Sequence, residues 1–109
     1  MADGSTGDGR YSADITWTTH GVAHVTAPTW GDLGFGQGWA CARDQFAAIV
    51  DHVVKVRSER ARHLGRGALD VHLHTDLGYL ALGVTERAER MRRGQPASIV
   101  ELVDGYAAG

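Results

Sequence analysis

The residue types best suited to metal chemistry in this 109-residue chain occur in one short segment, His72-Leu-His-Thr-Asp76. On a strand, His72 and His74 would face one side, and Asp76 could join them as a third zinc ligand. Three potential ligands within one loop are a weak signal, because loop histidines are usually solvated. We therefore predict solvated histidines here, with a zinc-binding loop as the alternative.

Cys41 is the single cysteine and the first candidate for a nucleophile. Arg43 and His24 could in principle stabilise its thiolate. Its neighbours, however, are small and apolar on a predicted helix, where cysteine behaves as a small hydrophobe. One cysteine also excludes an internal disulfide and a cysteine-based zinc site. No serine lies in a nucleophile elbow, so the sequence gives no basis for a Ser-His-Asp arrangement.

A second candidate site is the glycine-rich segment Gly34-Phe-Gly-Gln-Gly38. It matches neither the dinucleotide-binding fingerprint nor the phosphate-binding loop, and no lysine follows at the required position. Each glycine disfavours a helix by about 1 kcal/mol relative to alanine. Glycine does, however, allow another backbone to approach closely. We therefore predict that Gly34, Gly36 and Gly38 mark a tight packing contact on a helix.

The N-terminal part of the sequence predicts a β-hairpin after a disordered leader. Residues 1–12 are rich in glycine and polar residues, with no large apolar residue between Met1 and Tyr11. Residues 13–19 alternate apolar side chains with threonines, and residues 22–26 form a second apolar segment beyond Gly21. This pattern is typical of two half-buried strands joined by a turn.

The rest of the sequence predicts helices. One helix should begin near Trp30 and end at Gly65, with an apolar stripe along its second half. A loop over residues 68–75 should follow, and Thr75 should cap a helix that ends near Arg93. Pro96 suits the first turn of a last helix. The apolar stripe of the first helix consists of Phe46, Ile49, Val50, Val53 and Val54.

Composition limits the classes of partner. The formal net charge is -2, hydrophobic residues make up 43% and charged residues 22%, as in ordinary globular domains. Nothing in this balance favours nucleic acid or an anionic membrane surface. No apolar run approaches the roughly 20 residues that span a bilayer, and the polar start does not have the features of a signal peptide.

A mixed charge run, with Arg57, Glu59, Arg60 and Arg62, lies near the predicted end of the first helix. One interpretation is a solvated face with pairs three residues apart, each contributing about 0.2–0.5 kcal/mol. The alternative is a docking surface, in which the arginines bind carboxylates of a second chain. Both interpretations remain open at the level of residue pattern.

Four motifs resemble the opening of the penicillin acylase family, in its acyl-homoserine lactone and aculeacin acylase branch. They are His20-Gly-Val-Ala-His24, the segment from Gly34 to Asp44, Ser58-Glu-Arg-Ala-Arg-His-Leu-Gly65 and Asp104-Gly-Tyr-Ala-Ala-Gly109. The resemblance runs from about residue 14 to 109. At residues 21–24, relatives usually have Gly-Val-Pro-His, whereas this chain has alanine, Ala23, in place of the proline.

The resemblance implies an N-terminal-nucleophile hydrolase. In that family, a precursor cuts itself into a short first chain and a long second chain, which begins with Ser, Cys or Thr. That residue attacks the amide carbonyl, and its own α-amine acts as the base. The family fold is a four-layer αββα sandwich. Residues 13–109 look like the front part of the first chain, so we expect an α+β fold, mostly helical, with an N-terminal β-hairpin.

By the same resemblance, no catalytic or pocket residue is carried over to this chain. What maps onto it is scaffold, with expected structural or docking roles for Gly34, Gly36, Gly38, Arg43, Asp44, Arg57, Glu59 and Arg60. The expected partner is the missing remainder of the acylase, namely the second chain with its N-terminal Ser, Cys or Thr.

The expected reaction of the whole enzyme is hydrolysis of an acyl-homoserine lactone, a lipopeptide or a β-lactam side chain. The reaction needs no cofactor, and the family acts in the periplasm or outside the cell. We expect neither nucleic acid nor membrane as a partner. The alternative is a stand-alone, catalytically silent helical interaction module from a truncated gene.

Overall fold

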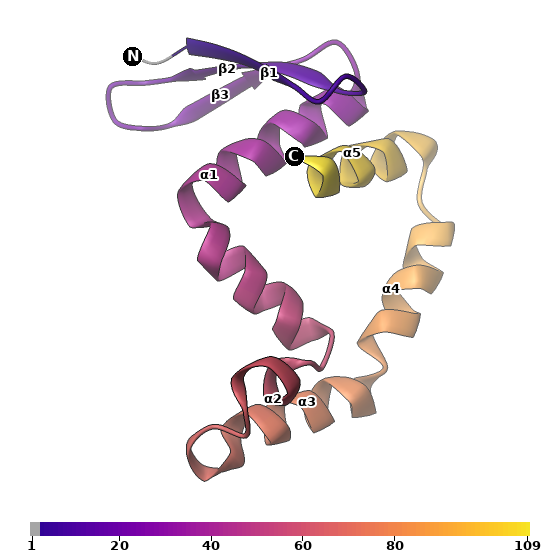
Figure 1. The fold of residues 1–109 in the computed structure, drawn as a ribbon. Coiled ribbons are helices and arrows are strands. Elements are labelled where there is room, and N and C mark those ends of the chain that lie inside the picture. Colours follow the sequence, from indigo (N-terminus) through magenta and orange to yellow (C-terminus); the bar gives the residue numbers. More distant parts are fainter. Residues whose placement is uncertain (1–2) are drawn as a thin grey trace. The chain divides into compact units, whose positions relative to one another are not determined.

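The structure is a computed structural model that describes residues 3–109. The chain divides into two compact units. The first comprises Met1–Gln45 and Gln95–Gly109, and the second comprises Phe46–Gly94. The predicted fold class is confirmed: helices predominate, and one small antiparallel sheet lies at the N-terminal end (Figure 1).

The sheet of the first unit has three antiparallel strands in the order β1-β2-β3. Their bounds are β1 Asp3–Gly7, β2 Ser12–Trp17 and β3 Ala23–Thr26. The predicted hairpin is confirmed by the β2–β3 register, which pairs Ile15 with Val25. Gly21 lies in the connecting turn with φ 78°, as the sequence predicted.

The prediction of a disordered leader over residues 1–12 is wrong from Asp3 onward, and residues 1–2 lie outside the described part of the chain. Strand β1 pairs with β2 along its whole length. The turn between them is held by the Asp8 carboxylate, which accepts hydrogen bonds from the backbone N–H groups of Arg10 and Tyr11 at 2.9 and 2.8 Å. A backbone ladder stabilises this strand, so its polar composition gave no indication of it.

Helix α1, Trp30–Val56, begins in the first unit and continues into the second, with a kink at Gln45, where φ is -136° and ψ is 29°. Its N-terminal part packs against the sheet, and the core between them contains Ala13, Ile15, Phe35 and Ala40. Ile15 is only 1% exposed. Because Phe35 also stacks on Tyr11, with ring centroids 5.9 Å apart, aromatic contacts extend this core toward the start of β2.

Helix α5, Ala97–Ala108, lies beside the N-terminal part of α1 in the first unit (Figure 1). As predicted, it follows Pro96, which is its N-cap residue. The carboxylate of Asp32 ties the sheet to the start of α1, because it accepts a hydrogen bond from Ser12 N at 2.9 Å and one from the Thr29 hydroxyl at 2.6 Å.

The second unit contains the C-terminal part of α1 and four short elements. They are α2 Arg60–Leu64, the 3-10 helix η1 Ala68–Asp70, α3 Val71–Leu82 and α4 Val84–Arg93. Two helices were predicted to be longer than they are. The first ends at Val56, since Ser58 has φ 60°, and the helix predicted to end near Arg93 is broken at Gly83, also with φ 60°.

The predicted start of the second helix at Thr75 is also wrong. Residues 68–75 form η1 and the first turn of α3, and the Thr75 hydroxyl donates to the carbonyl of Val71 at 2.8 Å. Thr75 therefore lies inside the helix and does not cap it. The turn before α3 uses left-handed backbone at Leu69 and Asp70, a conformation that the residue types do not signal.

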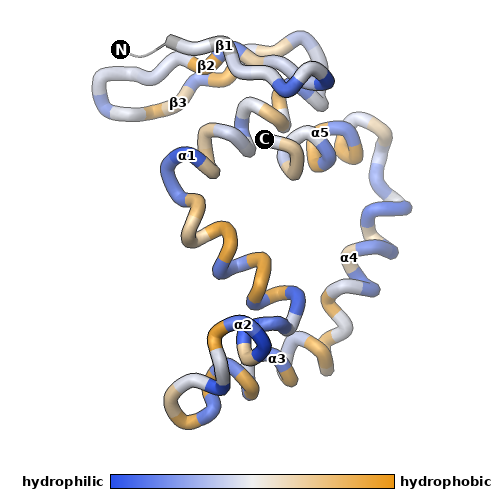
Figure 2. The backbone as a smooth tube through the Cα atoms, in the orientation of Figure 1, coloured by the Kyte–Doolittle hydropathy of each residue, from blue (hydrophilic) through white to orange (hydrophobic). Residues whose placement is uncertain are grey.

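Hydrophobic side chains remain at the surface of each unit. Figure 2 shows hydrophobic and hydrophilic residues alternating along the second part of α1. Of the stripe predicted there, Phe46 is 66% exposed, and Val50 and Val53 are more than two-fifths exposed. No helix among residues 3–109 is both long and apolar enough to cross a membrane.

Candidate functional site

The glycines of α1 form the closest helix contact of the first unit. A Cβ placed on Gly34 would collide with the carbonyl oxygen of Leu102, and one on Gly38 would collide with that of Tyr106. In the opposite direction, a Cβ on Gly105 would collide with the carbonyl oxygen of Gly31. The predicted close approach of a second backbone is therefore confirmed, and the approaching segment is α5.

Gly36 differs from its two neighbours. A Cβ there would lie 2.5 Å from Val25 Cγ1 and 2.7 Å from Ala13 Cβ. It therefore faces the sheet, whereas Gly34 and Gly38, each two positions away, face α5. Within this unit, all three predicted positions serve packing between elements of the same chain.

An open groove lies along α1 and α5 in the first unit, with a volume of about 480 Å³. Its lining is mostly apolar, with Gln37 and Tyr106 as its polar residues. We call it the α1–α5 groove; its lining comprises Ala23, Val25, Leu33, Gly34, Gln37, Leu102, Val103 and Tyr106. Such a groove can hold apolar groups, and its lining includes no carboxylate, imidazole or amine; the Tyr106 phenol is its one titratable group.

Cys41 lies beside this groove, on the same helix as Gln37. The Gln37 amide nitrogen donates to Cys41 Sγ at 3.6 Å. Burial, together with a hydrogen bond between Cys41 and the Tyr106 hydroxyl, raises the pKa of Tyr106 above its ordinary value. These contacts bring neither imidazole nor carboxylate to the thiol, so they do not assemble a nucleophile–base pair.

Arg43 lies against the sheet of the first unit. Its guanidinium carbon is 4.4 Å from the centre of the Trp17 ring, within the range of a cation–π interaction. Trp17 in turn contacts Trp39, with ring centroids 6.1 Å apart. The Arg43 Nε also lies 3.8 Å from the Asp44 carboxylate. Both residues are about half exposed, so each retains surface for a further partner.

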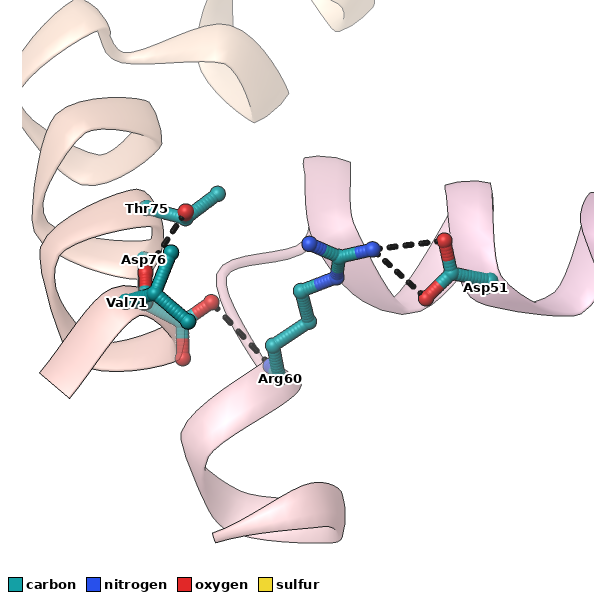
Figure 3. A network of polar contacts seen from close by, with 5 residues as sticks. All are labelled: Asp51, Arg60, Val71, Thr75 and Asp76. Carbon is teal, nitrogen blue, oxygen red and sulfur yellow. Dashed lines mark hydrogen bonds and ion pairs between the residues drawn. The ribbon is translucent and has the colours of Figure 1, made fainter. Parts of the chain in front are cut away.

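A polar network in the second unit links α1, α2 and α3 (Figure 3). Arg60 Nη2 donates to both carboxylate oxygens of Asp51, at 2.8 and 2.6 Å. This hydrogen bond is the main cause that lowers the pKa of Asp51 below its ordinary value. The predicted carboxylate contact of Arg60 therefore exists, but its partner belongs to the same chain.

Asp76 fixes the beginning of α2. Its side chain accepts hydrogen bonds from the backbone N–H groups of Arg60 at 3.1 Å and Ala61 at 2.8 Å. Asp76 is only 5% exposed. It therefore satisfies two N–H groups that a helix start leaves without partners. Sequence analysis missed this role, since the cap comes from a residue 15 positions away.

The same contacts change the interpretation of the histidine segment. His72 and His74 lie on α3, where residues two positions apart do not share a face. The Asp76 carboxylate is already used at the start of α2. The strand arrangement that would have aligned three ligands is therefore wrong, and residues 3–109 contain no group of three potential metal ligands.

The remaining residues of the charge run lie around this network. Glu59 precedes α2, and its carboxylate lies 3.7 Å from His63 Nε2, four residues further along the chain. Arg57 is exposed, just after the end of α1. Docking through Arg57, Glu59 and Arg60 stays a prediction.

A second open groove, of about 580 Å³, lies between the second part of α1 and α2. We call it the α1–α2 groove; its lining comprises Phe46, Ala47, Val50, Asp51, Val54, His63 and Leu64. Phe46, Val50 and Val54 belong to the apolar stripe that the sequence predicted. The contribution of Leu64 was not predicted, because it depends on the chain turning back at Ser58.

Comparisons with known proteins agree on one family. Residues 12–109 match the family model described as Penicillin amidase. The chain is 36% identical over 101 residues to the acyl-homoserine lactone acylase PvdQ of Pseudomonas fluorescens (strain Pf0-1), a match that covers 89% of this chain and 13% of that protein. It is 37% identical over 115 residues to the aculeacin-A acylase of Actinoplanes utahensis, a match that covers 99% of this chain and 15% of that protein.

A solved structure agrees with the fold. A thermostable penicillin G acylase from Alcaligenes faecalis matches with a TM-score of 0.75 at 20% sequence identity, over 99% of this chain and 53% of that one. The chain thus spans 13% and 15% of the lengths of these two sequence relatives. With a family match over nearly the whole chain and identities above 30%, this chain belongs to the penicillin amidase family of amide hydrolases, in the region of the α-chain.

Proposed function

We propose that this chain is the scaffold part of an N-acyl amide hydrolase whose catalytic nucleophile lies on polypeptide outside residues 12–109. The observation that carries the proposal is the extent of the match: nearly all of this chain aligns with only 13–15% of two acylases. In such an enzyme, the nucleophile would be an N-terminal Ser, Cys or Thr, activated by its own α-amine.

The residues of this chain support a scaffold role, with the nucleophile on the remaining polypeptide. The α1–α5 groove is lined by apolar groups, an amide and a phenol, and the hydrogen bonds of Cys41 within residues 3–109 join it to the Gln37 amide and the Tyr106 hydroxyl. The specific contacts of the chain are packing and structural contacts instead. They include the glycine contacts of α1 with α5 and the Asp51–Arg60–Asp76 network. We propose that these features hold the two units in the shapes that the rest of the enzyme needs.

The remaining scaffold positions are proposed to dock the second chain. Arg43, Asp44 and Arg57 are at least partly exposed and can form charge-assisted hydrogen bonds with a neighbouring polypeptide. Arg60 and Glu59 would act indirectly, by holding the turn that presents Arg57.

For the substrate, we propose an acyl amide of the kinds named in the relatives, with an acyl-homoserine lactone or a lipopeptide such as aculeacin first. Cleaving the former would inactivate an intercellular signal, and cleaving the latter would remove the lipid side chain of an antibiotic. From its membership of this family, we also propose that the whole enzyme works in the periplasm or outside the cell.

The test is a chimera in which residues 12–109 replace the matching segment of the Actinoplanes utahensis aculeacin-A acylase. We expect the chimera to release amine from aculeacin A. A control chimera, in which the first residue of the second chain is replaced by alanine, should release none. A correctly folded chimera without hydrolysis would refute the scaffold role and favour a silent interaction module.

A further inference from the structure

The α1–α2 groove exposes large apolar side chains on one side of the second unit. Phe46 and Leu64 are 66% and 58% exposed, and Val50 between them is 42% exposed. Phe46, Val50 and Val54 recur every four residues, so they share one face of α1. Ala47 and Asp51 continue the same wall. A clustered apolar surface of this kind marks an interaction site more often than scattered exposed residues do.

The walls of this groove are fixed by contacts within the chain. The Arg60–Asp51 hydrogen bonds join α1 to the start of α2, and Asp76 holds the first turn of α2. Leu64, at the end of α2, is therefore carried on a helix whose start is held on both sides. A groove with fixed walls loses less conformational entropy when a partner binds than a mobile one does.

The two titratable residues in the lining of the groove, Asp51 and His63, each have a partner. The Asp51 carboxylate accepts both hydrogen bonds from Arg60, and His63 lies 3.7 Å from Glu59. These pairs leave little charge for an ionic ligand, while the floor formed by Phe46, Val50 and Val54 is apolar. The lining thus favours apolar side chains over a nucleotide, a phosphate or an acidic peptide.

We propose that the α1–α2 groove seats apolar side chains of the acylase polypeptide that lies outside residues 12–109. The inference rests on the proposed function. It follows from the paired charges, the exposed apolar floor and the length of the relatives, because about six-sevenths of the aculeacin-A acylase lies outside the matched segment. In the whole acylase, the groove face of α1 is therefore the one that becomes buried. The face that carries Ala48 stays exposed.

Two adjacent alanines provide a matched test. Ala47 lines the groove and Ala48 does not, and both are exposed on the same helix in this chain. Ala47→Cys and Ala48→Cys are made separately in the isolated chain and in the chimera with aculeacin-A acylase. The rate of alkylation by iodoacetamide is measured at each position by peptide mass mapping, which separates it from Cys41.

In the isolated chain, we expect both cysteines to react at similar rates. In the chimera, position 47 should react at least tenfold more slowly, and position 48 should change less than threefold. A position 47 that reacts as fast in the chimera as in the isolated chain would overturn the proposal. So would concentration-dependent protection of position 47 in the isolated chain, because the occupant would then be a second copy.

The activity of the chimera is measured separately. Protection of position 47 without hydrolysis would support the docking surface and count against the proposed function. Hydrolysis with an unprotected position 47 would support the function and remove the docking surface.

Discussion

Replacing Gly34 by alanine tests the close crossing of α1 and α5. The new methyl carbon would collide with the Leu102 carbonyl oxygen and lie 2.9 Å from Tyr106 N, where ordinary contact begins near 3.4 Å. These are backbone atoms of a helix, so they cannot rotate away. Overpacking of this kind costs about 3 kcal/mol at the upper end of its usual range. Alanine offsets about 1 kcal/mol through its helix propensity, so Gly34→Ala should lower the free energy of unfolding by about 2 kcal/mol.

The assay can follow the first unit alone. All three tryptophans, Trp17, Trp30 and Trp39, lie in that unit, so urea unfolding followed by tryptophan fluorescence reports on it. The matched control is Gly78→Ala in α3, where a Cβ would meet nothing within 4 Å. It should stabilise the second unit by about 1 kcal/mol, measured by circular dichroism. A Gly34→Ala variant as stable as the wild type would refute the close crossing.

Three further predictions concern the polar contacts. Asp76→Ala leaves the part-buried N–H groups of Arg60 and Ala61 without their acceptor, so it should cost about 2 kcal/mol by circular dichroism in urea; a loss below about 0.5 kcal/mol would contradict the capping role. Arg60→Ala should raise the pKa of Asp51 toward its ordinary value in an NMR titration, since the hydrogen bond from Arg60 is the main cause that lowers it. Because the pKa of Asp51 is lower in the folded chain, the Arg60–Asp51 contribution to stability is present above pH 3.8 and is lost as the pH falls through the folded pKa. An unchanged Asp51 titration in the variant would refute Arg60 as the main cause of the lowered pKa. Arg43→Ala should cost about 0.5–1 kcal/mol in the fluorescence-detected unfolding of the first unit, through loss of the cation–π contact with Trp17; Arg43→Lys should recover part of it, and equal losses in both variants would point to a different cause.

Local patterns predicted the features that depend on local chemistry. Alternating apolar residues predicted β2 and β3, Pro96 predicted the start of α5, and the glycine spacing predicted close packing on α1. The identity of the approaching segment did not follow from that spacing. It required contact between Gly34 and Leu102, which are distant in sequence.

The misses have a common physical basis. Strand β1 depends on backbone hydrogen bonds and an aspartate turn, so its side chains give no apolar pattern. The break at Ser58 requires left-handed backbone at a residue that does not signal it. The role of Asp76 arises from a contact across 15 residues. Each of these features depends on a partner or a conformation that the local sequence does not specify.

The most direct measurement of the central claim is amide hydrolysis by the purified 109-residue chain alone, with intact aculeacin-A acylase as the positive control. The released amine is quantified with a fluorogenic amine reagent, using aculeacin A and an acyl-homoserine lactone as substrates. We predict no release above the background without enzyme, because the nucleophile is proposed to lie elsewhere in the acylase. Catalytic turnover by the isolated chain would contradict the account.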